Sequence, residues 1–409
     1  MAFPKQSANL TPHKDSVFTI VEMAKKAKAE VGEENIVDAT IGSLYDENSE
    51  LVAFESVFDH YDTIDHRLKA KYGSIAGNPN YLETVYQWVM PKEGSKLSHC
   101  VVATPGGTGA ITSSFITFLE ANQTIILPDV AWGSYRIMAN QFQFDIATYE
   151  MFEDDHFNLA SLKAQVENVK QKQDRVVIVL NSPCHNPTGY SLSMEEWKAL
   201  VSYLNEVSKE NQVILINDIA YIDYGYDVEH MRDYIKLFDT ISDQFLVMIA
   251  FSCSKTVTSY GLRCGAAIAL AQNEQDITDV KAVLERTARV VWSNIPNAAM
   301  ENFVWVINEN QEAFLKEKQI YIDLMKERSA LFVEEAKQCN LPIYPYKEGF
   351  FVTLKIEDNE QAKTIHEAFL KNHIYTVLVN KGIRIALCSL RLEKIKGLAQ
   401  KMQAIIQTL

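Results

Sequence analysis

Short apolar runs alternate with helical patterns through the middle of the chain. Buried strands are expected at Ile125–Leu127, Val176–Leu180, Val213–Asn217, Phe245–Ala250 and Ala266–Leu270. A helix such as Met194–Ser208 lies between two of them. Runs this continuously apolar indicate strands that are covered on both faces. The pattern therefore predicts an α/β protein with a mostly parallel sheet between layers of helices, with ligands at the carboxyl ends of the strands.

The last third of the chain has a different pattern. Val304–Ala336 reads as a long helix with a break near Ile320, and Phe350–Ile356 and Ile383–Leu387 read as strands with helices around them. This order predicts a smaller α+β domain. The predicted division has an N-terminal segment that packs with the small domain or reaches a partner subunit, then a large domain, then the small domain, over residues 1–50, 51–300 and 301–409.

Composition narrows the class of protein. The 409 residues are 47% hydrophobic and 22% charged, which is typical of a soluble globular enzyme. The net charge of −14 argues against nucleic acid and anionic membranes as partners. The six cysteines show no metal-ligand spacing and indicate free thiols, so we expect no metal site. The first ten residues lack an apolar signal region, and we expect a cytoplasmic protein.

Lys255 is the most informative residue. It follows an apolar strand and two serines, Ser252 and Ser254, and Arg263 stands eight residues later. A lysine in this position can form a Schiff base with pyridoxal phosphate (PLP), while the serines and the arginine hold the phosphate. The alternative is a surface lysine at the end of a strand.

Two upstream segments supply matching groups. Asp218 ends an apolar strand, and Tyr221 follows three residues later. A carboxylate there can keep the ring nitrogen of PLP protonated, and Tyr221 and Asn186 can donate to its phenolate oxygen. Taken singly, Asp218 reads equally well as a helix N-cap, and the Asn-Pro-Thr-Gly turn that begins at Asn186 as a simple tight turn. The order of the motifs, each after a strand, favours the cofactor.

A glycine-rich turn precedes the helical pattern Ala110–Leu119. Gly106, Gly107 and Thr108 would offer backbone N–H groups and a hydroxyl to a phosphate. The spacing is neither that of a dinucleotide fingerprint nor that of a P-loop, so those two classes are excluded. A turn without a ligand is the alternative.

From about Asp38 to its C-terminus the chain resembles the fold-type I PLP-dependent enzymes, and within them the class I aminotransferases of the aspartate and aromatic type. The segments that carry the resemblance are PGGTGA, CHNPTG, SCSK with Arg263, and GIRIA. The resemblance implies a PLP-dependent transferase fold, with a mostly parallel seven-stranded sheet in the large domain, a smaller α+β domain, and a homodimer.

The resemblance also implies roles for individual residues. The catalytic group would be Lys255, Asp218 and Tyr221. The cofactor-binding residues would be Gly107, Thr108, Trp132, Asn186, Asp218, Tyr221, Ser252, Ser254, Lys255, Arg263 and, reaching the partner subunit's phosphate, Tyr72. The substrate-binding residues would be Arg384, Arg289, Gly42, Asn186 and Trp132.

Two positions depart from the aspartate-type pattern. A histidine that supports the pyridinium aspartate usually stands three residues after the stacking tryptophan, and here that position is Tyr135. Asn181 likewise stands where a histidine is often found. We therefore expect the surroundings of Asp218 to be built differently, without predicting which groups form them.

The implied activity is transfer of an amino group from an L-amino acid to a 2-oxo acid such as 2-oxoglutarate. Arg384 would bind the substrate α-carboxylate. Arg289 would bind the distal carboxylate of aspartate or glutamate in the partner's site, or else be a helix-surface arginine, and it does not exclude aromatic donors. The alternative function is a PLP-dependent lyase or decarboxylase. A regulatory protein is disfavoured, because the chain has no room for a DNA-binding region.

Overall fold

The structure is a computed structural model that describes Phe3 and residues 16–409 of the chain. The start of the predicted N-terminal segment, apart from Phe3, lies outside the described residues. Within residues 16–409, no helix is both long and apolar enough to span a membrane.

Seven strands form the central sheet. In spatial order they are β2 (Ser98–Thr104), β10 (Gly265–Ala271), β9 (Phe245–Ser252), β8 (Gln212–Asp218), β7 (Arg175–Asn181), β3 (Thr124–Pro128) and β4 (Asp145–Tyr149). Only β10 runs against its neighbours in this sheet, and the other pairs are parallel. The predicted α/β class and the seven-stranded sheet are confirmed. The strands expected from apolar runs all form, whereas β2 and β4 had not been expected, since polar residues interrupt both.

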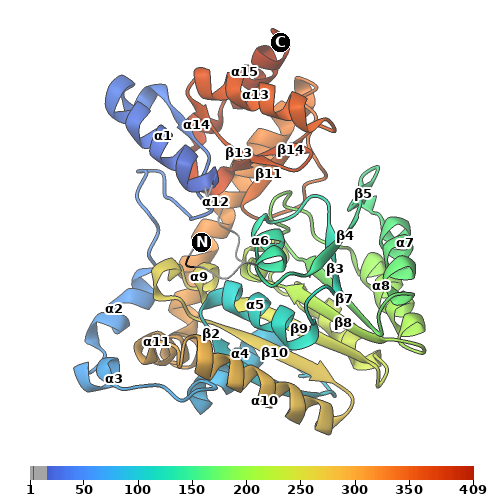
Figure 1. The fold of residues 1–409 in the computed structure, drawn as a ribbon. Coiled ribbons are helices and arrows are strands. Elements are labelled where there is room, and N and C mark those ends of the chain that lie inside the picture. Colours follow the sequence, from blue (N-terminus) through green and yellow to red (C-terminus); the bar gives the residue numbers. More distant parts are fainter. Residues whose placement is uncertain (1–2, 4–15) are drawn as a thin grey trace.

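The sheet is buried on both faces because its strands are apolar at successive positions. In β7, Val176 and Ile178 belong to one core cluster, and Val177 and Val179 belong to the other. One face is covered by α5 (Gly106–Phe118), α6 (Ser134–Gln141) and α10 (Glu274–Val291), of which α5 and α10 lie in front of the sheet in Figure 1. The other face is covered by α4 (Pro79–Val89), α7 (Leu159–Lys170) and α8 (Met194–Val207).

The C-terminal elements form a second, smaller body beside the sheet (Figure 1). Its three-stranded antiparallel sheet has β14 (Gly382–Ala386) between β11 (Phe351–Lys355) and β13 (Val377–Val379), and its helices are α13 (Asn359–Lys371), α14 (Leu392–Ile395) and α15 (Leu398–Ile406). The helix α1 (Ser16–Val31) lies with them, and β1 (Val37–Asp38) pairs with β12 (Ile374–Tyr375). The described part of the N-terminal segment therefore belongs spatially to the end of the chain.

The expected break in the long helix was misplaced. The chain forms α11 (Asn297–Asn308) and then α12 (Gln311–Gln338), so the break falls at Glu309–Asn310 and not near Ile320. Asparagine competes with the helix for backbone hydrogen bonds, which explains the interruption. Ile320 is simply an exposed apolar residue on the solvent face of α12.

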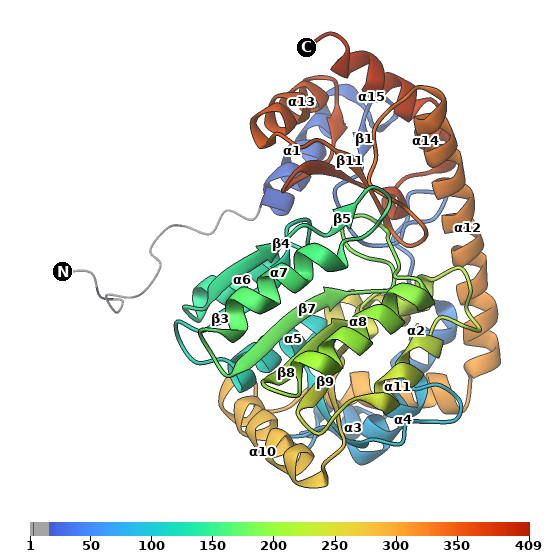
Figure 2. The same cartoon turned by 90° about the vertical axis from the view of Figure 1, so that its right-hand side faces the viewer.

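Figure 2 shows α12 running from the large sheet to the C-terminal elements. The predicted boundary at residues 300 and 301 falls inside α11, which packs on α2 (Glu55–Thr63) and α4. The division into domains itself stays a prediction. Shorter elements include α3 (His66–Ala70), α9 (Cys253–Thr256), β5 (Phe152–Glu153) and β6 (His156–Phe157).

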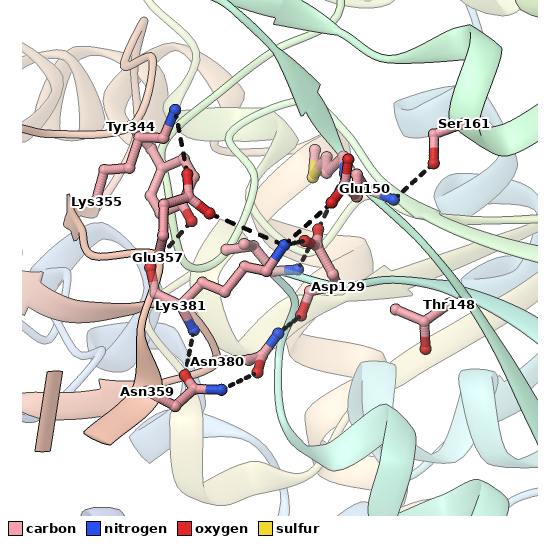
Figure 3. Close-up of polar contacts among 12 residues, drawn as sticks. Asp129, Thr148, Glu150, Ser161, Tyr344, Lys355, Glu357, Asn359, Asn380 and Lys381 are labelled. Atoms are coloured by element: carbon pink, nitrogen blue, oxygen red, sulfur yellow. Dashed lines mark hydrogen bonds and ion pairs between the residues drawn. The ribbon is translucent and has the colours of Figure 1, made fainter. Parts of the chain in front are cut away.

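A cluster of charged side chains joins the two bodies (Figure 3). Lys381, between β13 and β14, places its Nζ 3.0 Å from Asp129 Oδ2 and 3.4 Å from Glu150 Oε1. Glu357 Oε2 is 4.0 Å away, and Asn380 Nδ2 donates to the Asp129 carbonyl at 3.1 Å. We call these five residues the polar seam. Asp129 and Glu150 directly follow β3 and β4, so the seam lies at the carboxyl ends of the sheet.

Candidate active site

A cavity of about 400 Å³ opens at the carboxyl ends of the central strands. Among the residues that line it are all those predicted from the sequence except Gly106, Tyr72 and Arg289: Gly42, Gly107, Thr108, Trp132, Asn186, Asp218, Tyr221, Ser252, Ser254, Lys255, Arg263 and Arg384. They come from segments that are far apart in the chain, and the sheet brings them together because its parallel strands end at one edge.

Lys255 lies in α9, directly after β9. The Ser252 side chain caps this short turn by accepting from the Ser254 N–H. The Lys255 Nζ lies 5.0 Å from the centre of the Tyr260 ring and 5.6 Å from that of Tyr221. Burial lowers the pKa of the Lys255 amine to about 8. An amine with this pKa is neutral in a substantial fraction of molecules near neutral pH, and the neutral form is the nucleophile and base.

Asp218 is the last residue of β8 and is almost fully buried. Its Oδ2 accepts the Tyr135 hydroxyl at 2.5 Å, and its Oδ1 accepts the Ala220 N–H at 3.0 Å. Asn181 Nδ2 donates to its backbone carbonyl at 2.8 Å. Burial raises the pKa of Asp218, while the two donors and the nearby Lys255 charge lower it. Tyr135 and Asn181, the two positions that depart from the aspartate-type pattern, therefore both contact Asp218.

Asn186 connects three parts of the site. Its backbone N–H donates to Asn181 Oδ1 at 2.7 Å, and its Nδ2 lies 3.5 Å from the Tyr221 hydroxyl. Arg384, on β14, donates to Asn186 Oδ1 at 3.3 Å and to the Thr40 carbonyl at 2.7 Å. The buried Arg384 guanidinium of the C-terminal body therefore lies at the edge of the large sheet.

The aromatic and glycine positions set the shape of the cavity around Arg384. The Arg384 guanidinium lies over the Phe351 ring, 4.4 Å from its centre. At Gly42 a Cβ would come within 2.7 Å of the same ring, so only glycine lets the chain pass so close. On the other side of the cavity Trp132 is half-buried, and its indole meets the Tyr135 ring edge-to-face, with 5.4 Å between centres.

The start of α5 and the α9 turn form an anion cradle. Gly106 has φ +69°, and a Cβ there would lie 2.6 Å from Arg263 Nη2. Arg263 Nη1 donates to the Tyr260 carbonyl at 2.8 Å and to Ser254 Oγ at 3.3 Å. N–H groups in the first turn of a helix lack partners within that helix, so the start of α5, the hydroxyls and Arg263 together suit a phosphate. The residues present therefore fit PLP: a phosphate cradle, a buried carboxylate and an amine share one cavity.

Tyr72 and Arg289 are not brought into the cavity of their own chain. Tyr72 is 84% exposed, and the exposed Arg289 donates to Ser293 Oγ at 2.9 Å. Both had been expected to act in the site of a partner subunit, and that expectation stays a prediction.

Several residues of the cavity were not found from the sequence. Tyr260 lies beside Lys255 and accepts the Leu44 N–H at 3.0 Å. The Phe351 ring packs against the Arg384 guanidinium, and Phe18 of α1 and Ile41 also line the cavity. The sequence marked Tyr135 only as a departure from the aspartate-type pattern and did not predict its contact with Asp218. An aromatic or aliphatic residue without a polar motif carries no local signal that separates it from ordinary core.

Comparison with known proteins agrees with this geometry. The family model described as aminotransferase class I and II matches residues 36–402. The crystal structure of an aminotransferase from Anaerococcus prevotii superimposes with a TM-score of 0.95 at 32% identity, covering 99% of both chains. A structure of the aromatic-amino-acid aminotransferase from Burkholderia pseudomallei, covalently bound to pyridoxal phosphate, has a TM-score of 0.79 at 21% identity, over 98% of this chain and 99% of that one.

The curated relatives include aspartate and aromatic-amino-acid aminotransferases. The aspartate aminotransferase of Pseudomonas aeruginosa is 25% identical over 322 residues, 75% of this chain and 78% of that protein. The aromatic-amino-acid aminotransferase of the same organism is 27% identical over 220 residues, which is 53% of each chain. The matched segment thus spans about half the length of this second relative.

Proposed function

The chain belongs to the aminotransferases of class I and II, and on that premise we propose that it transfers the amino group of an L-amino acid to a 2-oxo acid such as 2-oxoglutarate. It is a PLP-dependent transaminase. One observation carries the assignment of its site: a low-pKa lysine, a buried carboxylate and a buried arginine line the same cavity.

Lys255, Asp218 and the anion cradle would hold PLP. When bound, the cofactor supplies an electron-accepting ring that stabilises negative charge at the substrate α-carbon. Lys255 serves as the general base that takes the proton from this carbon, because burial keeps its amine partly neutral near neutral pH. Asp218 would keep the ring nitrogen protonated, and Tyr221 and Asn186 would donate to the phenolate oxygen of the cofactor.

Arg384 binds the substrate α-carboxylate. A guanidinium forms two parallel hydrogen bonds to a carboxylate and so fixes its orientation. Because the Thr40 carbonyl and the Phe351 ring hold Arg384, little reorganisation is needed when the substrate enters. The fixed carboxylate directs the bond to the α-proton toward Lys255, which favours transamination over decarboxylation.

The choice of donor and the assembly form the finer part of the proposal. The names of the relatives support aspartate and aromatic amino acids as donors. Glutamate is included in the proposal because it also carries a second carboxylate. A homodimer would bring Tyr72 and Arg289 to the partner's cavity, where Arg289 would bind a second carboxylate. The cytoplasmic location predicted from the sequence remains part of this proposal.

The test begins with the purified protein and added PLP. Reduction with borohydride and peptide mapping should place the label on Lys255, and label on another lysine would overturn the assignment. The loaded protein is then mixed with one amino acid and no acceptor. We expect stoichiometric conversion of the cofactor to its pyridoxamine form together with the matching 2-oxo acid. Continuous release of ammonia would instead indicate a lyase, and release of carbon dioxide a decarboxylase.

A further inference from the structure

Tyr135 occupies the position next to Asp218 at which the aspartate-type enzymes carry a histidine. We propose that Tyr135 is a positioning residue, whose hydroxyl keeps the Asp218 carboxylate ionised and aimed at the ring nitrogen of PLP. The inference rests on the proposed function, since Asp218 can serve the ring nitrogen only if PLP binds in this cavity. It concerns a residue that acts through Asp218 and does not itself touch the cofactor.

The geometry of the contact is that of a strong hydrogen bond. The Tyr135 hydroxyl donates to Asp218 Oδ2 at 2.5 Å, and both side chains are buried. Hydrogen bonds from a hydroxyl to an ionised carboxylate are shorter and about twice as strong as those between neutral groups. Because Ala220 N–H holds the other oxygen at 3.0 Å, the carboxylate is fixed at both ends and cannot rotate freely.

A buried carboxylate needs such donors to remain charged. Burial by itself raises the pKa of Asp218, and the Tyr135 hydroxyl is the largest influence that lowers it, ahead of the Ala220 N–H and the Lys255 charge. Tyr135 itself stays protonated, because burial and the Asp218 charge raise its pKa. A histidine at this position would add a group that titrates near neutral pH. A tyrosine gives the same donor without that titration.

Tyr135 also connects Asp218 to the cofactor-stacking position. Its ring packs edge-to-face with Trp132, 5.4 Å between centres at 86°. Tyr135 is in the first turn of α6, and Trp132 lies two residues before that helix. The hydroxyl is therefore placed by a packed aromatic pair, and its aim at Asp218 does not depend on a flexible side chain.

The experiment measures cofactor binding to the full chain freed of PLP. Two ligands are compared: PLP and an analogue with carbon in place of the ring nitrogen. Tyr135→Phe keeps the ring and removes the hydroxyl. We expect PLP to bind about 10- to 100-fold more weakly to this variant, as for the loss of a hydrogen bond to a charged group. The affinity for the carbon analogue should match that of the unaltered protein, because the analogue makes no use of the Asp218 charge.

Two further variants complete the test. Tyr149→Phe is the matched control: Tyr149 is as buried as Tyr135, but its hydroxyl has no hydrogen-bond partner among the described residues, so PLP affinity should not change. Tyr135→His restores a donor and should recover most of the affinity for PLP. Its activity should gain a second pH dependence near neutrality, in addition to the one that the Lys255 amine gives the unaltered protein.

Each other outcome overturns the inference. If Tyr135→Phe weakens PLP and the carbon analogue equally, the residue only supports the local structure. If it weakens neither, or if Tyr135→His binds PLP no better than Tyr135→Phe, the hydrogen bond is not what matters. Failure of the unaltered protein to bind PLP at Lys255 would instead overturn the proposed function, and so the two failures are distinguishable.

Discussion

Two groups of charged and polar side chains lie at the carboxyl ends of the sheet: the floor of the cavity (Asp218, Lys255 and Asn186) and the polar seam. They differ in how far their charged groups are exposed to solvent. On the floor, Asp218 is 4% exposed and accepts hydrogen bonds from the Tyr135 hydroxyl of α6 and from the Ala220 N–H just after β8. In the polar seam, the Lys381 side chain is 26% exposed and that of Glu150 is 66% exposed. We therefore expect the substitution of a charged residue to have a large effect on the floor and a small effect in the polar seam.

The difference follows from solvation. A buried charge depends on its fixed donors, because no water can replace them. An exposed ion pair exchanges one set of partners for water and contributes about 0–1 kcal/mol. We therefore expect substitutions on the floor to change chemistry sharply and substitutions in the seam to change little.

The largest effect is expected for Lys255→Met. Activity should be lost at every donor concentration, because the variant has neither the cofactor-binding amine nor the general base. The cofactor-free variant should nevertheless unfold at higher denaturant concentration than the unaltered protein. Burial lowers the pKa of Lys255 from 10.5 to about 8, a penalty on the order of 3 kcal/mol that methionine removes.

The pH dependence of this gain has a definite sign. The penalty is fully present below about pH 8, where Lys255 is charged in both states, and it fades as pH rises toward its ordinary value of 10.5. Lys318→Met is the matched control, since burial also lowers the pKa of Lys318 to about 8. Lys318 lies 3.7 Å from Asp223, so its loss should destabilise the protein and leave the Lys255 chemistry in place. Equal gains in stability in both variants would contradict the stabilising role of the Lys318–Asp223 contact.

Substitutions of Arg384 show whether a residue of the C-terminal body affects activity as strongly as a residue of the floor does. Arg384→Gln should lower kcat/KM for aspartate, glutamate and phenylalanine alike, by about 2–5 kcal/mol in transition-state binding, because every amino acid presents an α-carboxylate. Arg384→Lys keeps the charge and loses the fork, so it should recover only part of the loss. Steady-state kinetics with the three donors would decide, and a loss confined to the dicarboxylic donors would show that Arg384 binds the side chain instead.

The sequence predicts the floor better than its surroundings for a physical reason. Lys255, Asp218 and Asn186 each follow an apolar strand within a local motif, so pattern and chemistry coincide there. The partner of Asp218 was not predictable, because Tyr135 meets it across 83 residues of chain. Tyr260 and Phe351 resemble core residues, and nothing in their neighbourhood marks them as parts of a site.

The fold shows the same limit. Apolar runs identified β3, β7, β8, β9 and β10, but such runs carry no direction, and β10 proved antiparallel to its neighbours. The helix break expected near Ile320 falls instead at Glu309–Asn310, between α11 and α12. The polar seam could not be predicted from the sequence, because Lys381 and Asp129 are far apart in the chain. Single exposed charges also form no sequence pattern.

The smallest effect is expected in the seam. Lys381→Met should lower the free energy of unfolding by about 0.2–1 kcal/mol and change kcat/KM by less than about threefold, since its ion pairs are partly exposed and lie outside the cavity. The stability difference should shrink at about 1 M salt. It should also be present below pH 10.5 and be lost at higher pH, because Asp129 and Glu150 raise the pKa of Lys381 above that value.

Lys355→Met is the control for the seam, because Lys355 is more exposed and pairs only with Glu357, at 3.4 Å. We expect it to change stability less than Lys381→Met does, because it has one exposed ion pair, and to leave activity unchanged. Urea unfolding and steady-state kinetics on both variants provide the measurements. A tenfold loss of kcat/KM in Lys381→Met alone would break the comparison. The seam would then hold the C-terminal body, and Arg384 with it, over the cavity, so that exposed ion pairs would position the chemistry as firmly as the buried floor does.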